Sequence, residues 1–130
     1  IGLQMLFDHS EEGDVAGLGV LRGRVTRFPR EKMLLPDGTQ LKVPHMGWNE
    51  VGQTRPHALW RDIAADSRFY FVHSYFVVPD DETITLGESR YGIPFTSAVA
   101  RDNIVAVQFH PEKSAQAGLQ LLANFMDWKP

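Results

Sequence analysis

Short apolar segments separated by turn signals fill the middle of the chain, and they predict a fold made mainly of strands. Residues 93–100 and 104–109 form the clearest pair, because both are apolar and Arg101-Asp102-Asn103 between them is typical of a tight turn. Pro36-Asp37-Gly38-Thr39 marks another turn between two extended pieces. Strands are therefore also expected over 19–28, 41–43, 68–78 and 83–86.

Helical patterns lie at the two ends of the chain and once in its middle. Residues 1–7 are expected to form the body of a short buried helix whose beginning lies upstream. Thr54-Arg55-Pro56 resembles a cap followed by a first-turn proline, so a second helix is expected over 54–65. A third helix is expected from the cap residue Ser114 to about Met126. Its predicted inward stripe is Leu119, Leu122, Phe125 and Met126.

These elements together favour a mixed α/β chain that forms part of a larger sheet with an antiparallel section. The 130 residues, 43% of them hydrophobic, are enough for one domain with an ordinary core. A net charge of −3 gives no basic surface for nucleic acid, and no apolar run approaches the roughly 20 residues that span a bilayer. The sequence has no Cys, which excludes disulfides and thiolate metal ligands. Because it opens without Met inside an apolar segment, we expect a fragment.

The segment 108–114 carries the strongest catalytic signal. His110 and Glu112 lie where a strand ends and a helix is about to begin, which is where α/β folds place their sites. If the extended backbone persists through Pro111, both side chains point to the same side, and the carboxylate can orient the imidazole. The spacing alone also fits a surface histidine beside a helix-start acid. Lys113 opposes the helix dipole, so it either meets a partner charge or points into solvent.

Two weaker signals lie earlier in the chain. The segment 44–50 places a large indole, an amide and a glycine turn after a short strand, although Trp is usually a core residue and Asn a loop residue. The segment 71–75 places His73 at the end of an apolar strand, where a half-buried histidine is the ordinary interpretation.

Five segments resemble, in the same order, the class I glutamine amidotransferases. They are Gly2-x-Gln4, PHMGWNEV at 44–51, FVHSYF at 71–76, YGIPF at 91–95 and VQFHPEKS at 107–114. More narrowly, the chain resembles the glutaminase subunits of imidazole glycerol phosphate synthase, an enzyme of histidine biosynthesis, because PHMGWN is much more specific than HPEKS. The resemblance implies a flavodoxin-like sheet with helices on both faces, with residues 1–130 as the distal part of a single domain.

The resemblance also implies a reaction. A cysteine in a strand-to-helix elbow attacks the side-chain amide of glutamine, and the match of Gly2 and Gln4 to the end of that elbow places this cysteine directly before Ile1. His110 is then the general base and acid, and Glu112 orients it. Because the attacking thiolate lies outside this sequence, the 130 residues alone are expected to be inactive.

A substrate site and a partner surface follow from the same resemblance. The partner is a (β/α) barrel synthase subunit that receives ammonia through a channel, and neither a cofactor nor a metal is expected. The implied compartment is the cytoplasm. The residues expected to hold glutamine are Gly2, Gln4, and the backbone around His73, Ser74 and Tyr75. The residues expected to face the partner are His45, Met46, Trp48, Asn49 and Lys113.

Three other functions stay open at this point. A non-catalytic glutamine-binding or regulatory module fits the absence of Cys. A metal hydrolase could use some of the histidines, although no two of them have the i, i+4 spacing typical of zinc helices. An amidotransferase subunit of another pathway would differ around Trp48. A serine nucleophile at Ser74 is disfavoured, because the G-x-S-x-G elbow is absent there.

Overall fold

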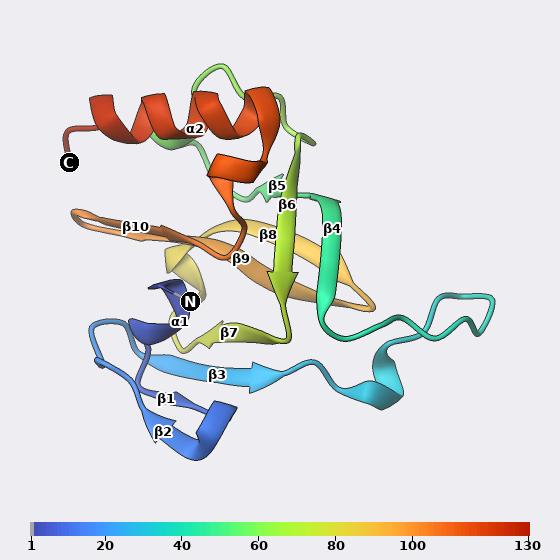
Figure 1. Cartoon of the computed structure of the whole chain (residues 1–130). Helices are drawn as coiled ribbons and strands as arrows, with labels where there is room; N and C mark the ends of the chain where they lie inside the picture. Colours follow the sequence, from blue (N-terminus) through green and yellow to red (C-terminus); the bar gives the residue numbers. More distant parts are fainter. Residues whose placement is uncertain (1) are drawn as a thin grey trace.

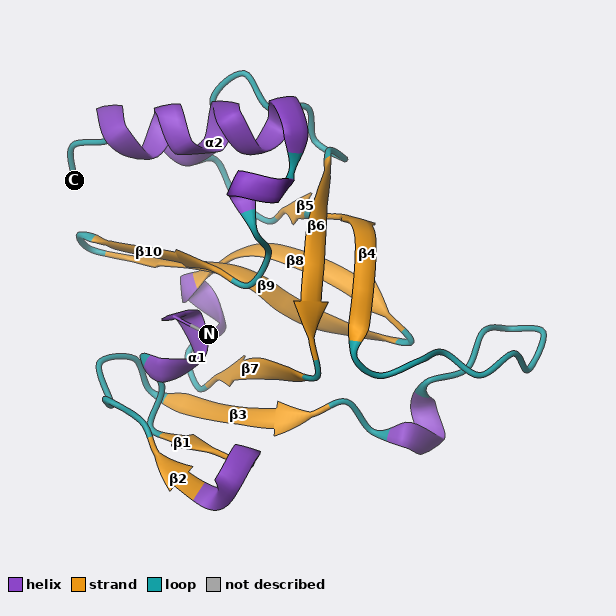
Figure 2. Ribbon diagram, in the orientation of Figure 1, coloured by secondary structure: helices purple, strands orange, loops and turns teal. Residues whose placement is uncertain are grey.

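The computed structural model describes residues 2–130 and shows a main sheet, a separate strand pair and one long helix (Figures 1 and 2). The main sheet has the strand order β2-β1-β3-β7-β9-β8-β5, with β10 paired to β9. Strands β4 and β6 form a second sheet. The strands are β1 (His9–Ser10), β2 (Val15–Ala16), β3 (Gly23–Arg27), β4 (His45–Glu50), β5 (Gly52–Gln53), β6 (Arg68–His73), β7 (Tyr75–Pro79), β8 (Thr85–Tyr91), β9 (Ile93–Arg101) and β10 (Ile104–Val107).

Antiparallel pairing dominates the described residues, and β1 with β3 is the one parallel pair among them. The α-helices are α1 (Gly2–Met5) and α2 (Ala115–Asp127). Short 3-10 turns are η1 (Glu12–Asp14), η2 (Arg30–Lys32), η3 (Ala58–Trp60), η4 (Glu82–Ile84) and η5 (Pro111–Lys113). Between residues 2 and 130, no helix is both long and apolar enough to cross a membrane.

The two helices pack on opposite faces of β9 and β10. Along β9, Ala98 and Ala100 belong to the larger core, whereas Val99 between them belongs to the smaller one, as the two-residue period of a strand requires. Helix α2 contributes Leu121 to the larger core, and α1 contributes Leu3 to the smaller one. The prediction of helices on both faces of a sheet with an antiparallel section is confirmed.

The predicted helix over 54–65 is wrong. Only Ala58–Trp60 is helical, as the 3-10 turn η3, and Asp62 has a left-handed φ of 61°. The side-chain amide of Asn124 donates to the carbonyls of Leu59 and Arg61, at 2.8 and 2.7 Å. Those carbonyls are therefore bound to α2 instead of to a helix of their own.

The predicted inward stripe of α2 is wrong by one position. Its buried residues are Gly118, Leu121 and Asn124. A Cβ at Gly118 would lie 1.9 Å from the carbonyl oxygen of Pro111, so only glycine allows the helix to approach there. The residues expected inside are exposed: Leu119, Leu122, Phe125 and Met126.

Several strand boundaries also differ from the prediction. The expected strand over 68–78 is divided at Ser74, where the chain passes from the β4–β6 pair to the main sheet. Residues 41–43 form no strand, and the neighbouring extended pieces meet only in the single bridge between Leu34 and Gln40. The segment 83–86 begins with the turn η4, and only its second half belongs to β8.

Candidate active site

The structure brings His110 and Glu112 together at the turn that links β10 to α2. His110 Nδ1 lies 2.8 Å from Glu112 Oε1. The contact does not come from strand alternation, because the extended backbone ends at His110 and Pro111 begins the 3-10 turn η5. The carboxylate can only accept a hydrogen bond, so Nδ1 of a neutral His110 carries the proton and Nε2 is left as a base.

Both side chains of this pair reach solvent. The exposed fractions are 36% for the His110 side chain and 58% for that of Glu112. Slight burial acts to raise the pKa of Glu112, but its own backbone N–H, the His110 hydrogen bond and the charges of His110 and Lys113 outweigh it, so the pKa is lowered. Glu112 is therefore ionised at neutral pH and can hold an imidazolium.

Ser114 fixes the backbone that carries His110. Its hydroxyl donates to the carbonyl of His110 at 2.6 Å and accepts from the backbone N–H of Tyr70 at 2.9 Å. The N–H of His110 in turn donates to the carbonyl of Tyr70 at 2.9 Å. Ser114 was expected to cap α2, but its side chain makes no cap hydrogen bond. Its hydroxyl instead connects the turn that carries His110 to β6.

A second polar cluster surrounds Gln4. Its Nε2 donates to the carbonyl of Tyr75 at 3.1 Å and to Gln108 Oε1 at 2.9 Å. Gln108 is 5% exposed, directly follows β10 and lies two residues before His110, so the bond connects α1 to the segment between β10 and His110. Gly2 is exposed, and Ser74 is half-buried with its carbonyl accepting from the Phe28 N–H.

The structure places His45 in the interior and not on the surface where a partner contact was expected. Its exposed fraction is 3%, because residues of β4 alternate and His45 points inward with the aromatic core. Its Nδ1 lies 2.9 Å from Nε2 of His73, which is 6% exposed. Burial lowers the pKa of both histidines to about 4.

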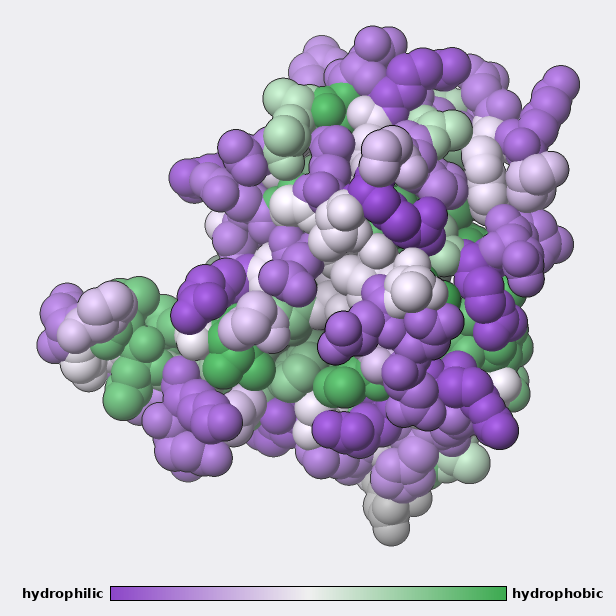
Figure 3. Space-filling model, turned by 180° about the vertical axis from the view of Figure 1, so that it is seen from behind, coloured by the Kyte–Doolittle hydropathy of each residue, from purple (hydrophilic) through white to green (hydrophobic). Residues whose placement is uncertain are grey.

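Of the remaining expected partner residues, Met46 and Trp48 lie on the outer face of β4, Asn49 lies on the same side of the strand as His45, and Lys113 lies on η5. Met46 is 63% exposed and Trp48 is 49% exposed, with the indole packed edge-on against Tyr70 at 5.9 Å between ring centroids. The Asn49 amide donates to the carbonyl of Arg90 at 2.8 Å. Figure 3 shows hydrophobic side chains gathered over the projecting segment of residues 33–43, whose Leu34 and Leu35 line a hollow shared with Met46 and Trp48.

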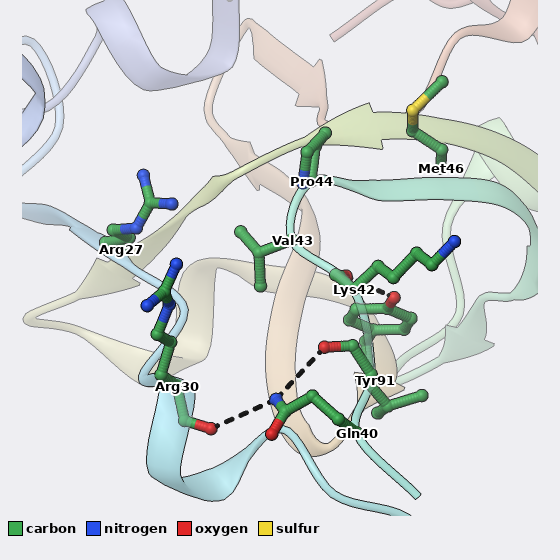
Figure 4. A pocket seen from close by; sticks show the side chains of 9 residues that line it. Arg27, Arg30, Gln40, Lys42, Val43, Pro44, Met46 and Tyr91 are labelled. Carbon is green, nitrogen blue, oxygen red and sulfur yellow. Dashed lines mark hydrogen bonds between the residues drawn. The ribbon is translucent and has the colours of Figure 1, made fainter.

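Next to this hollow lies a basic pocket that the sequence did not predict (Figure 4). Arg27, Arg30 and Lys42 line it together with Met46 and Tyr91. The Arg27 guanidinium also lies over the Tyr75 ring, 5.7 Å from its centroid. The three cations come from β3, η2 and the loop before β4, so no local motif brings them together. The contacts of Gln108 with Gln4 and of the Ser114 hydroxyl with Tyr70 were missed for the same reason, since these partners are distant in sequence.

No group of three or more His, Asp or Glu residues suited to a metal ion occurs in the part of the chain that the structure describes.

Comparison with known proteins gives consistent matches. The family model "Glutamine amidotransferase class-I" matches residues 1–128. Two proteins named "Imidazole glycerol phosphate synthase subunit HisH", from Aromatoleum aromaticum and Dechloromonas aromatica, are 66% and 67% identical over 130 residues. The alignments cover 100% of this chain but 61% and 60% of those proteins. The chain thus spans about three fifths of their length.

A solved structure gives an independent match of the fold. It is named as a GMP synthase protein from Thermoplasma acidophilum, and it aligns with a TM-score of 0.60 at 16% identity. The alignment covers 81% of this chain and 47% of that one. At this identity, the likeness concerns the fold alone.

Proposed function

Because the chain belongs to the class I glutamine amidotransferases, we propose that it is the distal part of a single glutaminase domain that hydrolyses glutamine to glutamate and ammonia. The observation that carries the proposal is the 2.8 Å contact between His110 Nδ1 and Glu112 Oε1 at the end of β10. It leaves Nε2 of His110 as a base whose orientation is fixed by a carboxylate, which acyl transfer requires.

The proposed nucleophile is a cysteine directly before Ile1. Its thiol gives a proton to Nε2 of His110, and the thiolate attacks the amide carbon of glutamine. His110 returns the proton to the departing nitrogen, so that ammonia leaves and a thioester remains. Water then attacks the thioester while giving a proton to Nε2, which releases glutamate and the thiolate. Glu112 remains an acceptor for Nδ1–H and stabilises the imidazolium in both steps.

The proposed glutamine site includes Gly2, Gln4 and the backbone around His73, Ser74 and Tyr75. The bond from Gln4 to the Tyr75 carbonyl supports this grouping, because it brings the chain after the proposed nucleophile against β7. The bond from Gln4 to Gln108 connects the same group to the strand that ends at the catalytic turn. The segment that follows the proposed nucleophile and the segment that leads to His110 therefore meet at Gln4.

The proposed partner is a (β/α) barrel synthase subunit that uses the ammonia to make imidazole glycerol phosphate for histidine biosynthesis, in a cytoplasmic heterodimer with lyase activity in the barrel. The names of the two bacterial relatives support this pathway. The exposed side chains of Met46 and Trp48 support a docking surface on β4, with Asn49 beside them and Lys113 on the exposed turn η5. The exposed apolar side chains of α2 support its place in a larger domain.

Covalent labelling of the complete subunit tests the proposal directly. A glutamine-derived chloroketone should label one cysteine, directly before Ile1, and abolish ammonia release. The 130-residue chain should stay unlabelled, because it has no Cys. Glutamine protection against labelling would be the specificity control. A complete subunit that binds glutamine but is not labelled and releases no ammonia would be a regulatory module instead.

A further inference from the structure

A directed line of hydrogen bonds crosses the interior between β4 and the Gln4 cluster. His45 begins β4 and His73 ends β6, and the two are opposite each other in the antiparallel register. Their rings meet at 2.9 Å between His45 Nδ1 and His73 Nε2. On its other side, His73 Nδ1 lies 2.8 Å from the carbonyl oxygen of Tyr75, the first residue of β7.

The Tyr75 carbonyl at one end and the Asn49 amide at the other determine which atom donates and which accepts in each hydrogen bond. A carbonyl oxygen only accepts, so His73 Nδ1 carries a proton and Nε2 of the neutral ring accepts from His45 Nδ1. His45 Nε2 is then free to accept from Asn49 Nδ2, which lies 3.4 Å away. The Asn49 amide is oriented independently, because its Nδ2 donates to Arg90 and its Oδ1 accepts from the Glu50 N–H, both at 2.8 Å.

The surroundings hold both rings neutral and in place. His45 is stacked between Phe71 and Tyr91, with ring centroids 4.9 and 4.0 Å away. Burial lowers the pKa of both histidines to about 4, and His110 acts in the same direction on His73. A proton on His45 Nε2 would also face the amide N–H group of Asn49. The tautomer with protons on both Nδ1 atoms satisfies every contact.

We propose that His45 and His73 are positioning residues of the glutamine site, which hold the Tyr75 carbonyl where it binds Gln4. That carbonyl receives two donors, Nδ1–H of His73 and Nε2–H of Gln4, at 2.8 and 3.1 Å. Two donors occupy both of its lone pairs and fix its direction. The inference rests on the proposed function, in which Gln4 and the backbone at 73–75 hold the substrate.

The proton positions can be measured without any assay of activity. NMR of the imidazole nitrogens in the complete subunit should show Nδ1 protonated and Nε2 unprotonated in both rings. The pattern should not change from neutral pH down to about pH 5, since both pKa values lie near 4. A proton on His73 Nε2, or titration of either ring near its ordinary pKa, would overturn the proposed relay, that is, the line of hydrogen bonds from Asn49 through His45 and His73 to the Tyr75 carbonyl.

Substitution separates positioning from a merely structural role. His45→Phe keeps the stacked ring but removes the donor to His73, so we expect the KM for glutamine to rise about tenfold, the equivalent of one hydrogen bond, while kcat changes less. His45→Gln retains a donor and an acceptor and should restore most of the loss. His57→Gln is the matched control, because His57 accepts from the Leu59 N–H outside the relay.

The outcomes distinguish the two proposals. An unchanged KM in His45→Phe, or a Gln variant as impaired as the Phe variant, would show that His45 only fills space. If His45→Phe does not fold, the ring-nitrogen measurement on the unaltered subunit still decides the proton positions. A complete subunit with the expected proton positions and no glutaminase activity would overturn the proposed function and leave the relay standing as a structural element only.

Discussion

The two histidine clusters of this molecule use the same side chain in opposite environments. His110 lies on an exposed turn, with 36% of its side chain accessible and a carboxylate on Nδ1. His45 and His73 lie among aromatic rings, at most 6% exposed, with only neutral groups as hydrogen-bond partners. A carboxylate stabilises the protonated ring, whereas burial opposes it. The comparison agrees with the proposed proton transfer by His110 and with the proposed positioning role of His45 and His73.

The largest expected effect tests the first half of the comparison. His110→Asn should lower kcat for glutamine hydrolysis by about 10²- to 10⁴-fold in the complete subunit, the range typical of a lost general acid or base. Glu112→Gln should cost less, because it orients the ring without exchanging protons, and its effect should lie in kcat more than in KM. Steady-state kinetics of both variants provide the measurement. If the His110 variant were as active as the unaltered subunit, the η5 turn would have a structural role and not a catalytic one.

The pH dependence of the free energy of unfolding tests the second half of the comparison, the buried pair His45 and His73. Free His45 and His73 have pKa values near 6.5, and burial lowers them to about 4 in the folded chain. The unfolded chain therefore takes up protons first, so the free energy of unfolding should fall as the pH drops from about 6.5 to about 4. Each histidine contributes a slope of about 1.4 kcal/mol per pH unit in that window.

Urea unfolding at several pH values, carried out on the complete subunit, measures this slope, and His45→Phe should make it shallower. Glu112 provides the contrast, since its pKa is lowered and its stabilising effect is present above about pH 4.5 and lost only at more acidic pH. An unchanged slope in His45→Phe would contradict the assignment of a neutral buried ring.

The inner and outer faces of β4 allow a comparison within one strand. Trp48→Ala on the outer face should weaken binding of the synthase subunit by about 2 kcal/mol or more, as expected for an aromatic anchor that becomes desolvated, with little dependence on salt. The loss should appear in the dissociation rate. Titration by calorimetry measures it, and glutamine KM of the free subunit serves as the control. Unaltered affinity would remove β4 from the interface.

The sequence was sufficient for the parts that depend on local patterns. Two apolar segments with a turn signal between them predicted β9 and β10, and the change from strand to helix predicted the position of His110 and Glu112. The local pattern failed where a distant group competes for the backbone. Residues 54–65 have a helical spacing of Leu59, Trp60 and Ile63, but the Asn124 side chain takes two of the carbonyls that a helix would need.

The same limit applies to the candidate site. The resemblance implied a partner-facing His45, and only its pairing with β6 reveals that it points inward to His73. Ser114 is a residue type typical of a helix cap, but its hydroxyl hydrogen-bonds to the backbone of Tyr70 and His110 instead. The pairing of β4 with β6 decides the direction of His45, and the contact with Tyr70 of β6 decides that of the Ser114 hydroxyl; no short-range pattern encodes either contact.

Ser114 also offers a test of how rigidly the turn with His110 and Glu112 is held. Ser114→Ala removes both hydrogen bonds of a residue that is 1% exposed, so it should destabilise the complete subunit by about 1–3 kcal/mol. Because the backbone of His110 then loosens, kcat should fall as well, by less than in His110→Asn. Chemical denaturation and kinetics of the same preparation measure the two effects. Full activity in a destabilised variant would show that Ser114 supports the fold and not the proposed catalytic position of His110.

The smallest expected effect belongs to Lys113, the exposed neighbour of the His110 and Glu112 pair on η5. A cation just before a helix is misplaced relative to the dipole, so a partner carboxylate would offset its cost only in the complex. Lys113→Ala should therefore change the free energy of unfolding of the free subunit by no more than roughly 0.5 kcal/mol, as for an ordinary surface substitution.

At low salt, the same variant should associate more slowly with the synthase subunit, and the difference should shrink as ionic strength rises, because an exposed charge acts by steering and is screened. This salt dependence separates Lys113 from Trp48, whose contribution comes from buried apolar area. Association rates of Lys113→Ala and Trp48→Ala at low and high ionic strength make the comparison. If Lys113→Ala associates normally at low salt and destabilises the free subunit, the lysine supports the η5 turn itself. Its charge would then stabilise Glu112 from one side, as His110 does from the other.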